Sequence, residues 1–162
     1  MRLWPSTSLR LRLLGLTAVG LALALLLAWF VLGGLFRDEA MRQFRLGLEQ
    51  QLDQLTARVE FDAQGRPTVD AAGLSDPRWH KPYSGLYWQV NDADQGAVLR
   101  SRSLWDTRLA NAPDTLGDAA VHVHAGTGPQ EAPLLVLERV VRSPDRPDTR
   151  WRLLVAGDTR AV

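Results

Sequence analysis

"LLGLTAVGLALALLLAWFVLGGLF", residues Leu13–Phe36, is the stretch that decides the fold of this 162-residue chain. Its 24 consecutive residues include no charged side chain. As an α-helix the stretch would be roughly 36 Å long, whereas the hydrocarbon core of a bilayer is about 30 Å thick. Arg2, Arg10 and Arg12 precede it, and Arg37 follows at once. These features predict a transmembrane helix over residues 13–36.

A cleaved signal peptide is the alternative interpretation of this stretch. The small residues of the triplet Ala22-Leu23-Ala24 resemble a signal peptidase site. Cleavage there would leave a second apolar run, Leu25–Phe36, on the mature protein. The apolar core of a signal peptide is also shorter, about 7–15 residues. We therefore expect an uncleaved anchor.

The charges that flank the apolar stretch bear on its orientation. Three arginines lie on the N-terminal side and three lie close on the other, so basic residues alone give no preference. The N-terminal flank has no acidic residue, whereas Asp38 and Glu39 dilute the positive charge after the helix. This asymmetry predicts a cytoplasmic tail over residues 1–12 and places residues 38–162 on the far side of the membrane.

The composition of the remaining chain excludes some classes of function. Residues 37–162 hold 16 basic and 18 acidic residues. Such a balance argues against a nucleic-acid partner, which requires a basic face. The chain has no cysteine, so it has neither disulfides nor thiolate metal ligands.

Residues 37–60 follow the membrane segment with a helical pattern of apolar side chains. The steps between these side chains are three or four residues, which places all of them on one stripe of an amphipathic helix. The stripe either packs on the sheet of its own domain or pairs with a second copy as a homodimer, since its spacing is close to a heptad seam. The stripe consists of Met41, Phe44, Leu48, Leu52, Leu55 and Val59.

Residues 61–162 have the alternation and turn residues of a small, largely antiparallel sheet. Two short strands are expected in residues 59–70, on either side of a turn at residues 63–65. Residues 84–106 are expected to form a hairpin whose turn is "NDADQG". Further strands are predicted at residues 120–125, 134–142 and 150–157, with turns at 126–133 and 143–149 and a loop at 107–120.

The two strands of the predicted hairpin alternate in character. In the first strand Leu86, Trp88 and Val90 should share one face, opposite Tyr87 and Gln89. In the returning strand the expected faces are Leu99, Ser101, Ser103 and Trp105 against Val98, Arg100, Arg102 and Leu104. The fold class is therefore α/β (α+β), with a transmembrane helix continuing into a long amphipathic helix packed on an antiparallel sheet.

Histidines are the first candidates for metal binding or catalysis. His122 and His124 are two residues apart on a predicted strand, so both rings should project from one face, an arrangement that suits a shared zinc or copper ion. No third ligand lies nearby in the sequence, so a polar strand face is the preferred interpretation. His80 is expected on a surface loop. A hydrolase built on these histidines is the weakest alternative, because no nucleophile–base pair is apparent.

Two other stretches of sequence do not match the calcium-binding and nucleotide-binding motifs that they partly resemble. In "NDADQG" the middle position of an EF-hand calcium loop is occupied by Ala93. Gly126 and Gly128 are not followed by the lysine and helix of a nucleotide-binding loop. We therefore expect no catalytic, cofactor-binding or metal-binding residues in this chain.

A basic and aromatic group is the remaining candidate site. Paired donors from Arg100 and Arg102 would suit a carboxylate or phosphate, and Trp105 lies close to them in the sequence. A solvated edge is the preferred interpretation for the arginines. Likewise, Tyr83, Tyr87, Trp88 and Trp105 are expected to serve packing more than ligand binding. Arg100, Arg102 and Trp105 are retained as the rim of a ligand site.

Five strings in this sequence carry a family resemblance: "SLRLRLL" (8–14), "DPRWHKPYSGLYWQV" (76–90), "VLRSRSLWD" (98–106), "PLLVLERVV" (133–141) and "RLLVAGD" (152–158). Together with the order of the predicted parts, they make nearly the whole chain similar to the N-terminal input region of bacterial two-component sensor histidine kinases. This resemblance implies a bacterial inner-membrane protein with a PAS-like periplasmic sensor domain, residues 61–162, followed in the full kinase by a second transmembrane helix, a phosphoacceptor histidine and an ATP-binding domain.

The kinase core implied by the resemblance is missing from this sequence. None of the three histidines has a phosphoacceptor setting, and no ATP-site motif occurs. ATP, Mg²⁺ and a cognate response regulator would therefore concern only the full-length kinase. The expected function is detection of an unknown periplasmic cue by the input half of a truncated or partial gene product. The alternative is a self-standing, single-pass envelope protein that scaffolds partners.

Overall fold

The computed structural model describes residues 9–92, 96–111, 120–143 and 146–162. The chain divides into two compact units, residues 1–42 and 43–162, and the boundary falls within one long helix, α1 (Leu9–Arg58). The helix contains the predicted transmembrane segment and most of the predicted amphipathic segment. It ends at Arg58 and not at residue 60, because Val59 begins strand β1.

In the first unit, α1 has an apolar surface that no other described part of that unit covers. Its large side chains from Leu11 to Phe36 are 48–76% exposed. The helix is long and apolar enough to cross a membrane, as expected. The Thr17 hydroxyl donates hydrogen bonds to the carbonyl oxygens of Leu13 and Leu14, at 3.0 Å each. This polar group is therefore satisfied within the helix, as a lipid environment requires.

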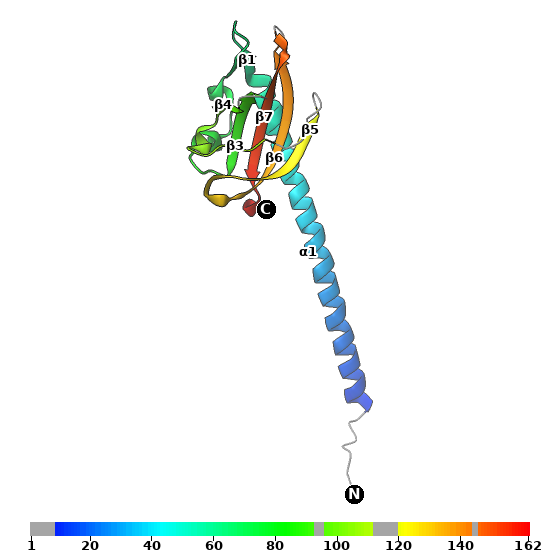
Figure 1. The fold of residues 1–162 in the computed structure, drawn as a ribbon. Coiled ribbons are helices and arrows are strands. Elements are labelled where there is room, and N and C mark those ends of the chain that lie inside the picture. Colours follow the sequence, from blue (N-terminus) through cyan, green and yellow to red (C-terminus); the bar gives the residue numbers. More distant parts are fainter. Residues whose placement is uncertain (1–8, 93–95, 112–119, 144–145) are drawn as a thin grey trace. The chain divides into compact units, whose positions relative to one another are not determined.

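The second unit is built on antiparallel sheets, as the turns between its strands predicted (Figure 1). In the described part of the chain the main sheet has five strands in the order β4-β3-β7-β6-β5, and every neighbouring pair is antiparallel. Strands β1 (Val59–Phe61) and β2 (Pro67–Val69) form a separate hairpin. The main sheet consists of β3 (Leu86–Asp92), β4 (Gly96–Arg100), β5 (Val121–Thr127), β6 (Pro133–Ser143) and β7 (Arg146–Asp158).

The final turns of α1 pack on one face of this sheet (Figure 1). Leu48, Leu52 and Leu55 are 0–3% exposed and contact a core that includes Trp88 and Val155. Burying each leucine stabilises the fold by about 1.5–3 kcal/mol. The apolar stripe thus packs on its own domain at these three positions. Homodimerisation through Met41–Val59 stays a prediction.

The opposite face of the sheet has its own core. Tyr87, Leu104, Leu154 and Ala156 lie in it, all nearly or fully buried. The alternation predicted for the first hairpin strand is confirmed, since Leu86, Trp88 and Val90 lie in the helix-side core and Tyr87 lies in the other.

Buried Gln89 also faces this second side. Its side-chain nitrogen donates to the Leu109 carbonyl, and its oxygen accepts from the Leu109 N–H, both at 2.9 Å. These two bonds fix the segment after β4 against the sheet. The rest of the predicted loop, residues 112–119, and the hairpin tip, residues 93–95, lie outside the described residues.

The predicted returning strand is wrong in its second half. Strand β4 ends at Arg100, and Arg102–Leu104 form a turn of 3-10 helix. Serine side chains replace the strand ladder here: the Ser101 hydroxyl accepts from the Trp88 N–H at 3.1 Å, and the Ser103 hydroxyl donates to the Leu86 carbonyl at 2.7 Å. Such local competition with backbone pairing is typical of serine and ends the period-two pattern.

Other predicted boundaries also change. Strand β5 continues to Thr127 and β6 begins at Pro133, so both ends of the predicted turn at 126–133 are strand. Strands β6 and β7 continue to the pairing of Ser143 with Arg146, so part of the predicted turn at 143–149 is strand. Short 3-10 turns also occur at Ala71–Gly73, Pro77–His80, Pro129–Glu131 and Thr159–Ala161.

Gly157 allows the helix to approach the sheet closely. A methyl group at this position would lie 2.5 Å from Cζ of Phe44 and 3.0 Å from Cδ2 of Leu48. We expect Gly157→Ala to lower the free energy of unfolding by about 1–3 kcal/mol, because α1 must shift away. Urea denaturation in mild detergent, followed by circular dichroism, measures this change.

Gly47→Ala is the matched control. Nothing lies within 4 Å of a methyl group at Gly47, so this helical substitution should stabilise the protein by up to about 1 kcal/mol. Equal stability of Gly157→Ala and the wild type would contradict the close approach.

A buried ion pair joins β6 to β7 on the second face. The Glu138 side chain is fully buried, and one of its oxygens accepts from Nη1 of Arg152 at 2.8 Å. Removing this cation would take an ion-pair partner from a buried carboxylate. We expect Arg152→Leu to lower the free energy of unfolding by about 3–5 kcal/mol. The double variant Glu138→Leu/Arg152→Leu should recover most of this loss in the same assay. If Arg152→Leu lowers the free energy of unfolding by less than the double variant does, the two side chains are not coupled.

Candidate functional site

A cavity of about 150 Å³ lies in the second unit, between α1 and the chain that leads into β3. The helix contributes the side of the cavity made by residues 44–51. Arg78 comes from the 3-10 turn Pro77–His80, and the start of β3 closes the cavity. Its walls are Phe44, Gly47, Leu48, Gln50, Gln51, Arg78, Gly85 and Leu86.

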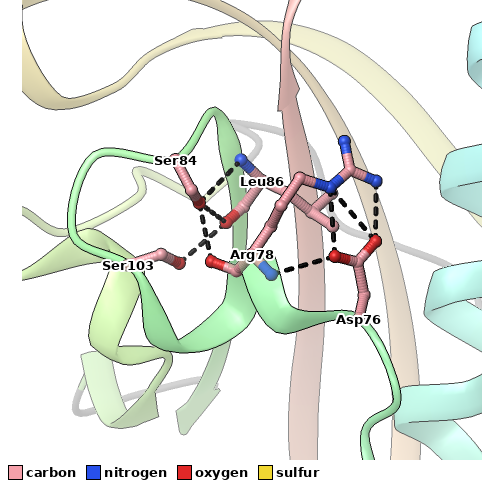
Figure 2. Close-up of polar contacts among 5 residues, drawn as sticks. All are labelled: Asp76, Arg78, Ser84, Leu86 and Ser103. Atoms are coloured by element: carbon pink, nitrogen blue, oxygen red, sulfur yellow. Dashed lines mark hydrogen bonds and ion pairs between the residues drawn. The ribbon is translucent and has the colours of Figure 1, made fainter.

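The Arg78 side chain is held in one orientation by Asp76 (Figure 2). Asp76 is the N-cap of the 3-10 turn and accepts the Arg78 N–H at 2.9 Å. Pro77 follows as the first residue of the turn, where its missing N–H costs nothing. The same carboxylate accepts from Nε of Arg78 at 3.1 Å and from Nη2 at 2.7 Å. One acidic side chain therefore both caps the turn and fixes the guanidinium.

Serine hydroxyls fix the wall opposite the helix (Figure 2). The Ser84 hydroxyl donates to the Arg78 carbonyl at 2.7 Å, and the Ser103 hydroxyl donates to the Leu86 carbonyl at 2.7 Å. Gly85, which lies between Ser84 and Leu86 in the sequence, has a φ of +85°, a conformation that favours glycine. The turn bearing Arg78 is thus tied to the first residues of β3.

The electrostatic state of the site follows from this pairing. The side-chain hydrogen bond from Arg78 lowers the pKa of the Asp76 carboxyl below its ordinary value of 3.8, although burial opposes the shift. The same hydrogen bond raises the pKa of Arg78. Both groups are therefore charged at neutral pH, and together they add no net charge to the cavity wall.

Gln51 supplies an unsatisfied polar group. Its Oε1 atom is buried and has no hydrogen-bond partner among the described residues. An unpaired buried acceptor costs about 1–3 kcal/mol.

The residues predicted as a ligand rim lie together but outside this cavity. Nη1 of Arg100 donates to the Thr107 carbonyl at 3.2 Å, and the Arg102 guanidinium lies 6.0 Å from the centre of the Trp105 ring. Trp105 is 52% exposed and has a φ of 53°. Arg100 ends β4 and Arg102 begins the 3-10 turn, so they do not share a strand face as expected. Their role as a ligand rim stays a prediction.

His122 and His124 lie on one face of β5, as their spacing predicted. His122 is paired with Glu138 across the β5–β6 ladder, and Nδ1 of His124 is buried without a partner among the described residues. Within the described ranges, no group of three or more His, Asp or Glu side chains could hold a metal ion. His80 lies on an exposed position of the 3-10 turn next to Trp79.

The sequence held only part of the signal for the cavity. "Asp76-Pro77-Arg78" is a readable N-cap followed by proline, which predicts a helical turn. Gln51 lies beside the buried stripe of α1, but nothing local indicates that it lines the same cavity as Arg78. The cavity could be located only once both elements were packed on one sheet.

Comparisons with known proteins returned nothing: no family model, no curated protein and no solved structure matches this chain.

The Asp76–Arg78 pair should make stability depend on acid pH. Because the folded-state pKa of Asp76 is lowered, its contribution is complete above the unfolded pKa of about 3.8 and is lost as the pH falls through the folded value. We expect Asp76→Asn to be less stable at pH 7 and to lose less stability than the wild type between pH 5 and about pH 2. Urea midpoints across this range measure the difference. If the urea midpoints of the wild type and Asp76→Asn fall in parallel as the pH is lowered, ionisation of Asp76 does not contribute to stability.

Proposed function

We propose that this chain is the membrane anchor and periplasmic sensor portion of a bacterial two-component sensor histidine kinase, with α1 inserted in the inner membrane and a PAS-like domain outside it. The observation that carries the proposal is the continuity of α1 from Leu9 to Arg58. One helix contains both the apolar segment and the leucines buried in the domain core. A change at the domain end of this helix would therefore act on a helical backbone that continues into the apolar segment.

Population shift supplies the mechanism. A ligand that binds two arrangements of the domain unequally shifts their ratio in favour of the one that it binds better. Phe44, Leu48 and Gln51 belong to α1 and also line the cavity, so a bound molecule would contact the helix directly. The chain itself is proposed to be non-catalytic, with ATP, Mg²⁺ and a response regulator used only by a kinase core.

A self-standing envelope scaffold is the second candidate. Two exposed aromatic residues favour it: Tyr83 is 43% exposed with a φ of 56°, and Trp105 is 52% exposed with a φ of 53°. Left-handed backbone at bulky residues is costly and clusters at functional sites. The Tyr83 N–H donates to the Ser103 carbonyl at 2.9 Å, which brings the two segments together. Such a surface would suit a protein partner.

The sensor and the scaffold differ in how they should respond to a change in helix phase, that is, to a rotation of the N-terminal part of α1 about the helix axis. A chimera carries residues 1–162, then the second membrane helix and kinase core of a well-characterised sensor kinase. One, two or three alanines inserted after Arg42 rotate the preceding part of α1 by about 100° each. A sensor should give reporter output that changes roughly several-fold and rises and falls with the number of alanines.

Output that is unaffected by helix phase would favour the scaffold. Orientation is checked first with a phosphatase that is active only in the periplasm, fused after Val162. We expect the phosphatase fusion to be active. If the phosphatase is inactive and a fluorescent protein that folds only in the cytoplasm is fluorescent at the same fusion site, the periplasmic placement is wrong.

A further inference from the structure

Exposed basic and aromatic side chains occur together where two 3-10 turns meet. The turn Pro77–His80 packs against the turn Arg102–Leu104. The Tyr83 N–H donates to the Ser103 carbonyl at 2.9 Å, which joins the chain after the first turn to the second turn. The exposed side chains of these segments and their flanks form what we call the basic–aromatic patch: Lys81, Tyr83, Arg100, Arg102, Trp105 and Arg108.

The positive charge of the patch is not neutralised. None of its cations has an ion-pair partner among the described residues. Arg100 donates from Nη1 to the neutral Thr107 carbonyl at 3.2 Å, and the Arg102 guanidinium lies 6.0 Å from the centre of the Trp105 ring. The acidic residue in the same stretch of sequence is Asp106. The patch is therefore net positive, which favours an anionic partner.

The two aromatic residues of the patch are kept out of the core at a cost in backbone energy. Tyr83 is 43% exposed and Trp105 is 52% exposed, and their φ angles of 56° and 53° are unfavourable for bulky side chains. The other Trp and Tyr residues of the second unit are 1–5% exposed: Trp79, Tyr87, Trp88 and Trp151. The domain thus buries its other large aromatic rings and exposes those that lie beside unpaired cations.

The patch belongs to the end of the domain at which α1 enters. The Ser103 hydroxyl bonds the Leu86 carbonyl, Leu86 pairs with Gly157, and Gly157 lies against Phe44 of α1. Only residues 37–43 separate Phe44 from the predicted membrane segment. Even a fully extended link of this length spans less than about 30 Å. A bilayer that holds the apolar segment is therefore within reach of this end of the domain.

A phospholipid surface matches the chemistry of the patch. Trp and Tyr have an apolar body and a polar tip, and they prefer the headgroup level of a membrane. Arg side chains match the oxygen geometry of phosphate, and anionic lipids attract Arg and Lys that lie near the surface. The covalent link to α1 also raises the effective concentration of lipid at the patch, whereas a soluble partner has no such advantage.

We propose that the basic–aromatic patch docks on an anionic phospholipid surface. Trp105 lies at the level of the headgroups, and Arg100 and Arg102 bind lipid phosphates. The inference depends on the proposed function only for the insertion of α1 in a membrane, because docking requires no kinase.

Fluorescence quenching of the full chain reconstituted in vesicles tests the proposal. The vesicles carry phospholipids brominated near the headgroup and consist of phosphatidylcholine alone or of equal parts phosphatidylcholine and phosphatidylglycerol. Subtracting the signal of Trp105→Phe isolates the emission of Trp105. We expect its quenching to be at least twofold greater in the anionic vesicles. Equal quenching in both vesicles, or none in either, would overturn the proposal.

Salt provides a second test that uses only the wild type. Raising the NaCl concentration from about 0.1 M to about 1 M shortens the Debye length from about 10 Å to about 3 Å. The additional quenching in anionic vesicles should then fall to the level in phosphatidylcholine. Quenching that is insensitive to salt would overturn the role of the cations, even if a variant of the patch fails to fold.

Matched variants locate the docking surface. Arg100→Gln/Arg102→Gln should lose at least half of the additional quenching in anionic vesicles. The control Arg58→Gln/Arg66→Gln removes the same charge from exposed side chains at the end of α1 and the β1–β2 hairpin, and should leave the quenching unchanged. An equal loss in both double variants would overturn the assignment of docking to this patch.

A protein partner is the outcome that would replace the lipid. Absence of lipid quenching, together with crosslinking to a protein in cells by a photoreactive amino acid in place of Trp105, would overturn the proposal in favour of such a partner. Lipid docking with chimera output that does not depend on helix phase would overturn only the sensor function. Phase-dependent output without lipid quenching would overturn only this inference.

Discussion

The packing of three leucines of α1 on the five-stranded sheet is the contact on which the rest of the structure depends. Leu48, Leu52 and Leu55 are almost fully buried, and they join the end of a membrane-length helix to the core of the domain. Gly157 makes the contact close, because any side chain there would collide with Phe44 and Leu48. Without this packing the helix would not form one wall of the cavity, and the domain would lose most of its helix-side core.

Short local motifs build the other wall of the cavity. Asp76 caps a 3-10 turn and holds Arg78, Ser84 ties that turn to β3, and Ser103 bonds the carbonyl of Leu86. Each bond is modest by itself, about 0.5–1.5 kcal/mol net. Together they hold Arg78 in the wall of a cavity that Gln51 also lines, although these residues are distant in the sequence. The site is therefore a product of one long-range packing contact and several short-range caps.

Much of the fold could be predicted because its signals are periodic. The membrane helix, the stripe at Leu48–Leu55 and the alternation of Leu86–Val90 follow from hydrophobic spacing. Antiparallel pairing of the strands follows from the short turns between them, whereas their order in the sheet was not predicted. The errors fall where side chains compete with the backbone or where long-range pairing decides. Ser101 and Ser103 end β4 early, the ladder extends β7 to Arg146, and β1 takes Val59 from the helix.

The sequence by itself determined that a 24-residue apolar helix leads into a small α+β domain, because hydrophobicity and its period are local properties that any packing must satisfy. The identity of the site was decided by the tertiary structure alone. Whether Arg78 or Arg100 faces a cavity depends on which elements meet across the sheet, and that is settled by burial and register over the whole domain. The local sequence pattern does not show which distant residues become neighbours in the folded chain.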